Sequence, residues 1–102
     1  MTSAFNATQP KALDLDEILI ALSSRPPWSY RNGVIELRLQ GLGFDQVCEL
    51  VQQINQLSNE TDHHPELHYG YRNLMVQYRT HDVNGITERD LACADRILTL
   101  LG

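Results

Sequence analysis

The sequence has few basic residues, no run of one charge sign and no long apolar segment. Lysine and arginine together number 8 among 102 residues, against 13 acidic residues, and the formal net charge is -5. Binding to a phosphate backbone depends on clustered positive charge, so direct nucleic-acid binding is disfavoured, and nothing favours an anionic membrane surface as partner. No apolar run approaches the length of a membrane span, and no charged-then-apolar leader opens the chain. We therefore expect a cytoplasmic protein.

Glycine, proline and cysteine are also scarce. The chain has 6 glycines and 4 prolines beside 42% hydrophobic residues, which argues against a disordered or fibrous protein. Its two cysteines, Cys48 and Cys93, lie within apolar helical patterns, and we expect both to be small buried side chains in a reducing compartment. The length fits one domain with a modest core. We expect a flexible tail over residues 1–12 and a single domain over residues 13–102.

Three segments have the period of an amphipathic helix. Asp14 and Glu17 predict a capping box at the start of the first, which the prolines in residues 23–27 should end. The second should end near residues 58–59, and Thr87 should cap the third, with Asp90 in its first turn. The predicted apolar stripes are Leu15, Ile18, Leu19 and Leu22 in the first helix, Phe44, Val47, Cys48, Val51, Ile54 and Leu57 in the second, and Leu91, Ala94, Leu98 and Leu101 in the third.

Four further segments read as strands, at residues 28–31, 35–40, 67–71 and 74–80. The first two flank Asn32–Gly33, a dipeptide typical of a tight hairpin turn. The second alternates between a covered face, with Ile35, Leu37 and Leu39, and a wetter face, with Glu36, Arg38 and Gln40. The resulting order is α-β-β-α-β-β-α. It predicts an α+β fold in which three helices pack on one face of a four-stranded antiparallel sheet.

All four histidines lie between residues 59 and 90. One interpretation treats them as ordinary polar residues at the ends of helices and strands. A second makes His63, His64, His68 and His81 metal ligands, but adjacent histidines chelate one ion poorly and no carboxylate or thiolate lies at a usual zinc spacing, so no metal site is predicted.

A third interpretation is acid–base catalysis. Pro65 restricts His64 to an extended conformation, and His81, at the end of a neighbouring strand, can return beside it. A carboxylate at Asp90 could orient one imidazole or bind a polar NH group of a substrate. Imidazoles on two sides of a small molecule could remove one proton and deliver another, as elimination of water requires. No activated Ser or Cys nucleophile and no Gly-rich phosphate loop accompanies them.

The arrangement of these residues resembles the pterin-4a-carbinolamine dehydratases, also called 4a-hydroxytetrahydrobiopterin dehydratases. The matching residues are His63-His64-Pro65, Tyr71, Thr80-His81-Asp82 and Gly85-Ile86-Thr87-Glu88-Arg89-Asp90, and the likeness extends from about Leu13 to Leu98.

The resemblance implies a lyase that dehydrates the 4a-hydroxypterin left by aromatic amino acid hydroxylases to quinonoid dihydropterin, in tetrahydrobiopterin recycling. It implies no metal or organic cofactor, and assembly into homodimers or homotetramers. By resemblance, the catalytic residues would be His63, His64, His81 and Asp90, and the substrate-binding residues Asn59, Pro65, Tyr71 and Thr80.

Two positions depart from the family pattern. Asn59 stands where a charged residue, commonly Glu, is usual, and Asn cannot carry charge or accept a proton at neutral pH. Leu67 replaces a frequent aromatic residue. An alternative function therefore stays open, in which a catalytically weak dehydratase-like protein binds a protein partner. Relatives of that kind assemble RuBisCO of carboxysomes or dimerise a transcription factor, and the sheet face of Glu36, Arg38 and Gln40 would then matter most.

Overall fold

The structure is a computed structural model that describes residues 10–102; most of the expected flexible tail, residues 1–9, lies outside them. The elements are α1 (Leu15–Ser23), β1 (Ser29–Arg31), β2 (Val34–Gln40), α2 (Phe44–Thr61), β3 (Glu66–Tyr69), β4 (Asn73–Tyr78), the short 3-10 helix η2 (His81–Val83) and α3 (Glu88–Leu101). The four strands form one antiparallel sheet in the order β1-β2-β4-β3. The predicted α+β class and element order are confirmed.

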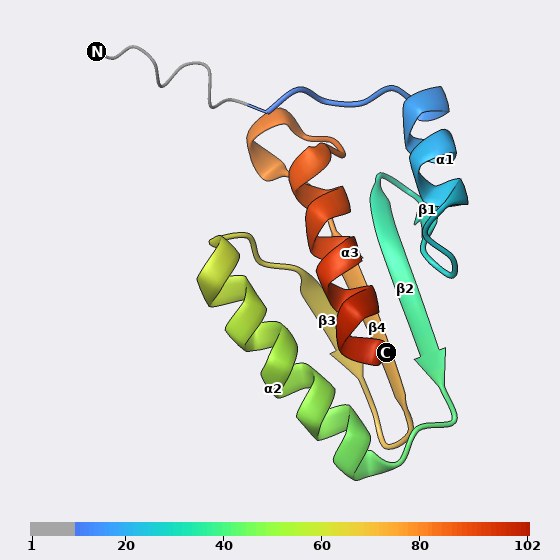
Figure 1. The fold of residues 1–102 in the computed structure, drawn as a ribbon, viewed down its shortest axis with the longest axis vertical. Coiled ribbons are helices and arrows are strands. Elements are labelled where there is room, and N and C mark those ends of the chain that lie inside the picture. Colours follow the sequence, from blue (N-terminus) through green and yellow to red (C-terminus); the bar gives the residue numbers. More distant parts are fainter. Residues whose placement is uncertain (1–9) are drawn as a thin grey trace.

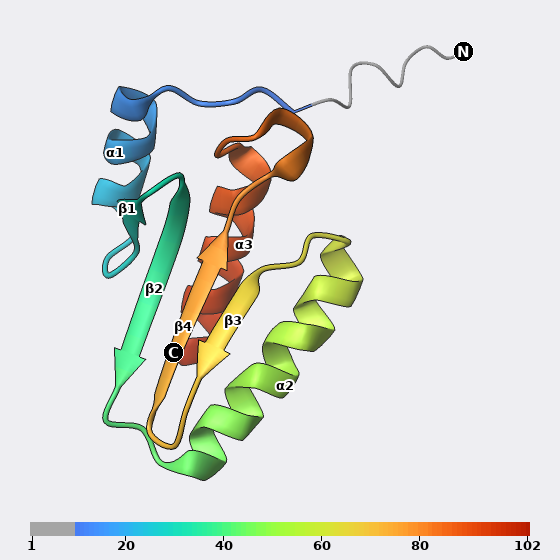
Figure 2. The same ribbon diagram turned by 180° about the vertical axis from the view of Figure 1, so that it is seen from behind.

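The helices lie on one side of the sheet, with α3 in front of the central strands and α2 beside β3, while the opposite view exposes the other sheet face (Figures 1 and 2). One hydrophobic core joins all the layers. Its buried members include Ile18 and Leu22 of α1, Ile35 and Leu37 of β2, Ile54 and Leu57 of α2, Leu74, Val76 and Tyr78 of β4, and Leu91, Ala94 and Ile97 of α3. No helix within residues 10–102 is both long and apolar enough to cross a membrane.

Local signals in the sequence set most of the element boundaries. The Asp14 side chain accepts a hydrogen bond from the Glu17 backbone N–H at 2.8 Å, and the Glu17 carboxylate accepts one from the Asp14 N–H at 2.9 Å. Asn32 and Gly33 both have positive φ, as the turn between β1 and β2 requires. Helix α2 continues two residues past the predicted end, where the Thr61 hydroxyl donates to the Leu57 carbonyl at 2.9 Å.

Some predicted core positions are wrong. Leu15 and Leu19 are exposed, because α1 lies at the edge of the sheet beside β1 and buries only Ile18 and Leu22. Cys93 is buried as predicted, but Cys48 is exposed on the outer side of α2. In α3 the buried stripe runs through Ile97, and Leu101 is partly exposed at the end of the chain.

The polar face of β2 also differs from the prediction, because Glu36 is only 2% exposed. Its carboxylate accepts hydrogen bonds from the Gln77 side chain at 3.0 Å and from Arg38 Nε at 2.8 Å, and Arg31 lies 3.9 Å away. The long side chains around Glu36 therefore cover its carboxylate, which the alternation of β2 predicts to be exposed to water. The hydrogen bond from Gln77, together with Arg38 and Arg31, holds the pKa of Glu36 below its ordinary value against the opposing effect of burial.

This lowered pKa predicts an acid-sensitive contribution to stability. A carboxylate whose pKa is lower in the folded state stabilises the fold above its unfolded pKa of about 4.3, and the contribution is lost as the pH falls through the folded value. The stability advantage of the unmodified protein over Glu36→Gln should therefore shrink between neutral pH and about pH 3, as measured by urea unfolding. Glu49→Gln, which changes an exposed carboxylate of α2, is the control, and an advantage that does not depend on pH would contradict the prediction.

Candidate active site

His63 and Asp90 meet where the end of α2 approaches the start of α3. His63 lies in the segment between α2 and β3, and Asp90 lies in the first turn of α3. The distance between His63 Nε2 and Asp90 Oδ1 is 2.7 Å, and the two side chains are 13% and 0% exposed. An ionised carboxylate only accepts hydrogen bonds, so in neutral His63 the proton lies on Nε2 and the lone pair on Nδ1.

The other oxygen of Asp90 accepts two hydrogen bonds. The Thr80 hydroxyl donates to Oδ2 at 2.8 Å, and the Thr87 backbone N–H donates to the same atom at 2.9 Å. Thr87 is the N-cap of α3, and its hydroxyl also lies 2.8 Å from that of Thr80. Asp90 therefore closes the capping box of α3 and holds His63 at the same time.

Buried aromatic rings support His63 from behind. The imidazole stacks on Tyr78, with ring centroids 5.4 Å apart and an interplanar angle of 20°. The centroid of the Tyr78 ring in turn lies 6.2 Å from that of Trp28. Burial raises the pKa of Tyr78 far above its ordinary value, and burial also raises the pKa of the Cys93 thiol. Both groups thus stay protonated at neutral pH and add no charge beside His63.

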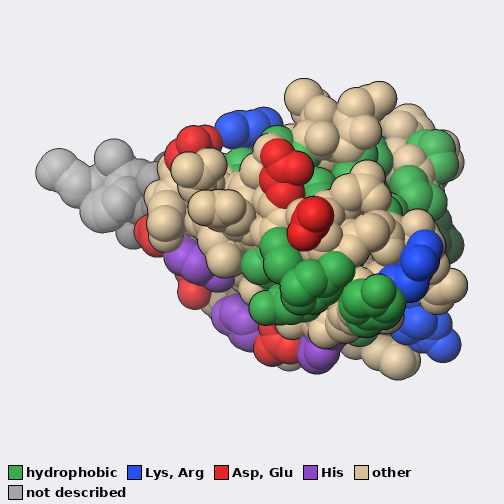
Figure 3. Space-filling model, turned by 90° about the horizontal axis from the view of Figure 1, so that it is seen from below, with side chains coloured by type: hydrophobic (Ala, Val, Ile, Leu, Met, Phe, Trp, Pro, Cys, Tyr) green, Lys and Arg blue, Asp and Glu red, His purple; other side chains and the backbone are tan. Residues whose placement is uncertain are grey.

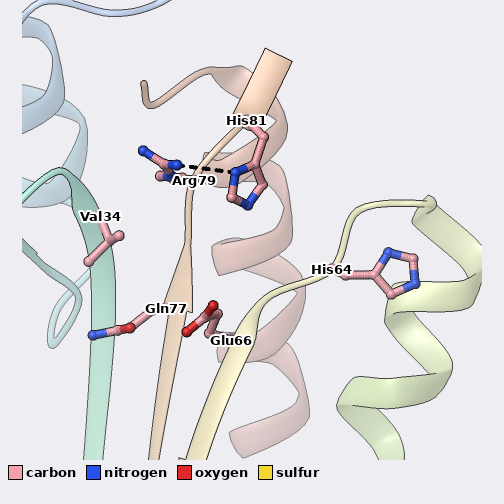
Figure 4. Close-up of a pocket in the computed structure, with 6 residues that line it drawn as sticks. All are labelled: Val34, His64, Glu66, Gln77, Arg79 and His81. Atoms are coloured by element: carbon pink, nitrogen blue, oxygen red, sulfur yellow. Dashed lines mark hydrogen bonds between the residues drawn. The ribbon is translucent and has the colours of Figure 1, made fainter. Parts of the chain in front are cut away.

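In front of His63 the surface forms a hollow of about 290 Å³. Its lining includes three of the four histidines, and consists of Asp62, His63, His64, Arg79, Thr80, His81, Asp82 and Arg89. A second hollow shares His64, Arg79 and His81 and continues over the sheet to Val34, Glu66 and Gln77. Figure 4 shows the imidazole of His64 on the α2 side of the segment before β3, with Arg79 and His81 on the other side, where the chain leaves β4 and enters η2.

His81 has a defined hydrogen-bond partner in this hollow. Arg79 Nη2 lies 3.2 Å from His81 Nδ1, the contact drawn as a dashed line in Figure 4. A guanidinium can only donate, so Nδ1 of His81 accepts and the proton of the neutral ring lies on Nε2. In their neutral forms, His63 has its lone pair on Nδ1, the nitrogen not bonded to Asp90, and His81 has its N–H on Nε2, the nitrogen not bonded to Arg79.

The other residues predicted to bind substrate lie apart from this hollow. Asn59 is exposed on the last turn of α2, and Pro65 immediately precedes β3. Tyr71 is 74% exposed at the opposite end of the sheet, where it stacks on Phe44 at a centroid distance of 6.2 Å. Figure 3 shows hydrophobic side chains gathered on that end of the molecule. The structure thus joins His63, His64, Thr80, His81 and Asp90, but not Asn59, Pro65 or Tyr71.

Several lining residues were not predicted from the sequence. The carboxylate of Glu60 turns away to Arg96 at 2.9 Å, whereas Asp62, whose αL backbone ends α2, lines the hollow. A carboxylate three positions after Asn59 therefore lines the hollow. Arg79 could have been found, because the alternation of β4 puts it on the same face as His81.

His68 is separate from the other three histidines. It lies 3.7 Å from Glu66 and lines a hollow on the outer sheet face with Arg38 and Met75. Within residues 10–102, no group of three or more His, Cys, Asp or Glu side chains is placed to hold a metal ion. The four-histidine ligand set is therefore not assembled in the fold.

Comparison with protein families finds one match over nearly the whole chain. A family model described as Pterin 4 alpha carbinolamine dehydratase matches residues 11–100. A protein of Sulfolobus acidocaldarius, provisionally named as that dehydratase, is 33% identical over 85 residues, which cover 83% of this chain and 93% of that protein. A protein of Bdellovibrio bacteriovorus with the same provisional name is 34% identical over 96 residues, which cover 90% and 80%.

Two solved structures share the fold. The crystal structure of a transcriptional coactivator/pterin dehydratase from Brucella melitensis matches with a TM-score of 0.85 and 26% identity, over 90% of this chain and 100% of that one. A pterin dehydratase-like protein identified as a RuBisCO assembly factor in the alpha-carboxysome has a TM-score of 0.61 and 20% identity, over 74% and 87%. At that identity the second likeness concerns the fold alone.

Proposed function

Because the chain belongs to the pterin 4 alpha carbinolamine dehydratase family, we propose that it dehydrates 4a-hydroxytetrahydrobiopterin to quinonoid dihydropterin by acid–base catalysis. The observation that carries the proposal is the hollow lined jointly by His63, His64 and His81, with Asp90 buried beneath His63. The proposed role is tetrahydrobiopterin recycling in the cytoplasm, by a homo-oligomer that needs no metal or organic cofactor.

The reaction requires one proton to be removed and one to be delivered. In a 4a-hydroxypterin the hydroxyl-bearing carbon adjoins a ring N–H. Elimination breaks the carbon–oxygen bond, removes the proton from the nitrogen and forms a carbon–nitrogen double bond, while the hydroxyl takes up a proton and leaves as water. Positioned imidazoles suit both transfers near neutral pH.

The ring nitrogens divide the two roles. His63 would accept the proton of the ring N–H at Nδ1, since its Nε2 is bonded to Asp90. His81 would deliver a proton to the departing hydroxyl from Nε2 as the imidazolium, the form in which Nδ1 also carries a proton and no longer accepts from Arg79. His64 is exposed between the two hollows and would contact the substrate from the side of the sheet. Asp62 and Arg89 would supply polar contacts at the rim.

The test is the rate of 4a-hydroxytetrahydropterin dehydration by the purified protein beside the Asn59→Glu variant. We expect clear turnover in the unmodified protein and a change below about tenfold in the variant, because Asn59 lies outside the hollow and Asp62 already lines it. Turnover that appears only in Asn59→Glu would mean that the pocket is silent in this chain, and would contradict the proposal.

A binding role is the second candidate, favoured by the exposed Phe44–Tyr71 pair. Contiguous exposed aromatic groups are frequent at protein–protein contacts, and Phe44, Tyr69 and Tyr71 are each about half exposed or more. For this role the partner would be another protein, bound at the surface that carries these aromatic side chains. An inactive unmodified protein in the assay above would favour this candidate.

A further inference from the structure

The two oxygens of Asp90 have different surroundings. Oδ1 lies 2.7 Å from His63 Nε2, whereas Oδ2 accepts from both the Thr80 hydroxyl and the Thr87 backbone N–H. The carboxylate is 0% exposed, so no substrate can reach either oxygen. Asp90 therefore acts through His63, as a positioning residue.

The hydroxyl groups of Thr80 and Thr87 form a one-way chain of donors. Each hydroxyl has a single proton, and Thr80 gives its proton to Asp90, so Thr87 must donate in the 2.8 Å contact between the two hydroxyls. The Thr87 oxygen in turn accepts from the Arg89 backbone N–H at 3.2 Å. The chain ends on Oδ2, and its direction cannot be reversed while that atom is a carboxylate oxygen.

We propose that Thr80 and Thr87 hold the Asp90 carboxylate in the orientation that keeps the proton of neutral His63 on Nε2, and that an amide at residue 90 would be oriented by the same two donors. In the Asp90→Asn variant, the amide carbonyl must take the Oδ2 position, since an NH₂ group there would face two donors. The NH₂ group then takes the Oδ1 position and donates to His63 Nε2. The neutral ring is forced to carry its proton on Nδ1, the reverse of its state in the unmodified protein.

Only the expected effect on catalysis rests on the proposed function; the proton position on His63 does not. With its proton on Nδ1, His63 can no longer accept the proton of the substrate N–H. Asp90→Asn should therefore lower kcat about 10²-fold or more, the range of a lost general base, with a smaller change in KM. Thr80 is then a positioning residue rather than a substrate ligand.

The experiment locates the imidazole protons directly, by ¹⁵N–¹H correlation spectra of ¹⁵N-labelled protein. The spectra are recorded at a pH high enough that His63 is neutral, which is reached when its ¹⁵N shifts no longer change with pH. We expect Nε2–H in the unmodified protein and Nδ1–H in Asp90→Asn. Asp95→Asn, which removes a carboxylate from the exposed side of the same helix, should keep Nε2–H. Two double variants test the hydroxyl of residue 80 as a donor. Asp90→Asn/Thr80→Val removes that hydroxyl and should restore part of the Nε2–H form of His63. Asp90→Asn/Thr80→Ser keeps the hydroxyl and should not restore it.

Two results would overturn the inference. One is Nδ1–H at His63 in the unmodified protein, a measurement that needs no variant to fold. The other is an unchanged proton position in Asp90→Asn when thermal unfolding shows that the variant is folded. Neither result depends on dehydration. A protein with the expected protons and no turnover would refute the proposed function and leave this inference intact.

Discussion

Replacing His63 with alanine is expected to lower kcat for dehydration about 10²-fold or more, the effect of losing an acid–base group from the reacting centre. His81→Ala should have an effect of the same order, because the proposed roles of the two rings are complementary and neither can take over the other. His63→Ala also leaves Asp90 Oδ1 buried without a donor, which costs about 1–3 kcal/mol. A domain of this size is expected to tolerate that loss and stay folded.

The matched control is His68→Ala. This histidine is exposed, lies 3.7 Å from Glu66 and does not line the hollow of the other three, so its removal should leave turnover within about twofold. Circular dichroism and thermal unfolding establish that each variant is folded. Unchanged turnover in both His63→Ala and His81→Ala would refute the acid–base assignment.

The fold was predictable because its boundaries carry local signals. Asp14 with Glu17, and Thr87 with Asp90, start two of the helices, and the chain between β1 and β2 turns at Asn32–Gly33. Each is satisfied by residues within a few positions of one another, so sequence spacing alone describes the interaction. The predictions of burial were wrong where the surroundings of a side chain are formed by residues distant in the sequence.

Glu36 and Cys48 illustrate such errors. Alternation places Glu36 on the solvent side of β2, but Gln77, 41 positions later in the chain, donates to its carboxylate. The helical stripe of α2 includes Cys48, yet its side chain is exposed. Periodicity shows which residues share a face, whereas burial also depends on what packs against that face.

The site was predicted in part for the same reason. His63, His64, Thr80, His81 and Asp90 lie within one stretch of the sequence, and the structure brings them together where the chain leaves β4 and where α3 begins. Tyr71 belongs to the same stretch but lies at the far end of β3 and β4. Strand length, rather than sequence distance, separates it from the histidines. No sequence pattern indicates the hydrogen bonds from His63 to Asp90 and from Arg79 to His81, which distinguish the two nitrogens of each imidazole.

Tyr78→Ala is expected to destabilise the fold by about 3–5 kcal/mol, the cost of removing a buried aromatic side chain. The ring is fully buried in β4, between Trp28 and His63. Its loss would open a cavity where the core meets the site, and His63 would lose the surface on which it stacks. Urea unfolding at neutral pH measures the change in free energy, and Tyr69→Ala, on the exposed strand β3, is the control.

Tyr78→Phe separates the ring from its hydroxyl. The buried Tyr78 hydroxyl interacts with the Cys93 thiol, a weak hydrogen-bonding group, so its removal should change stability by less than about 1 kcal/mol. If Tyr78→Phe were as unstable as Tyr78→Ala, the hydroxyl rather than the ring would support the core. If instead only the ring matters, Tyr78→Phe should also keep the turnover of the unmodified protein. Tyr78 would then support His63 through the packing of its ring alone, and the proton position on His63 would depend on Asp90.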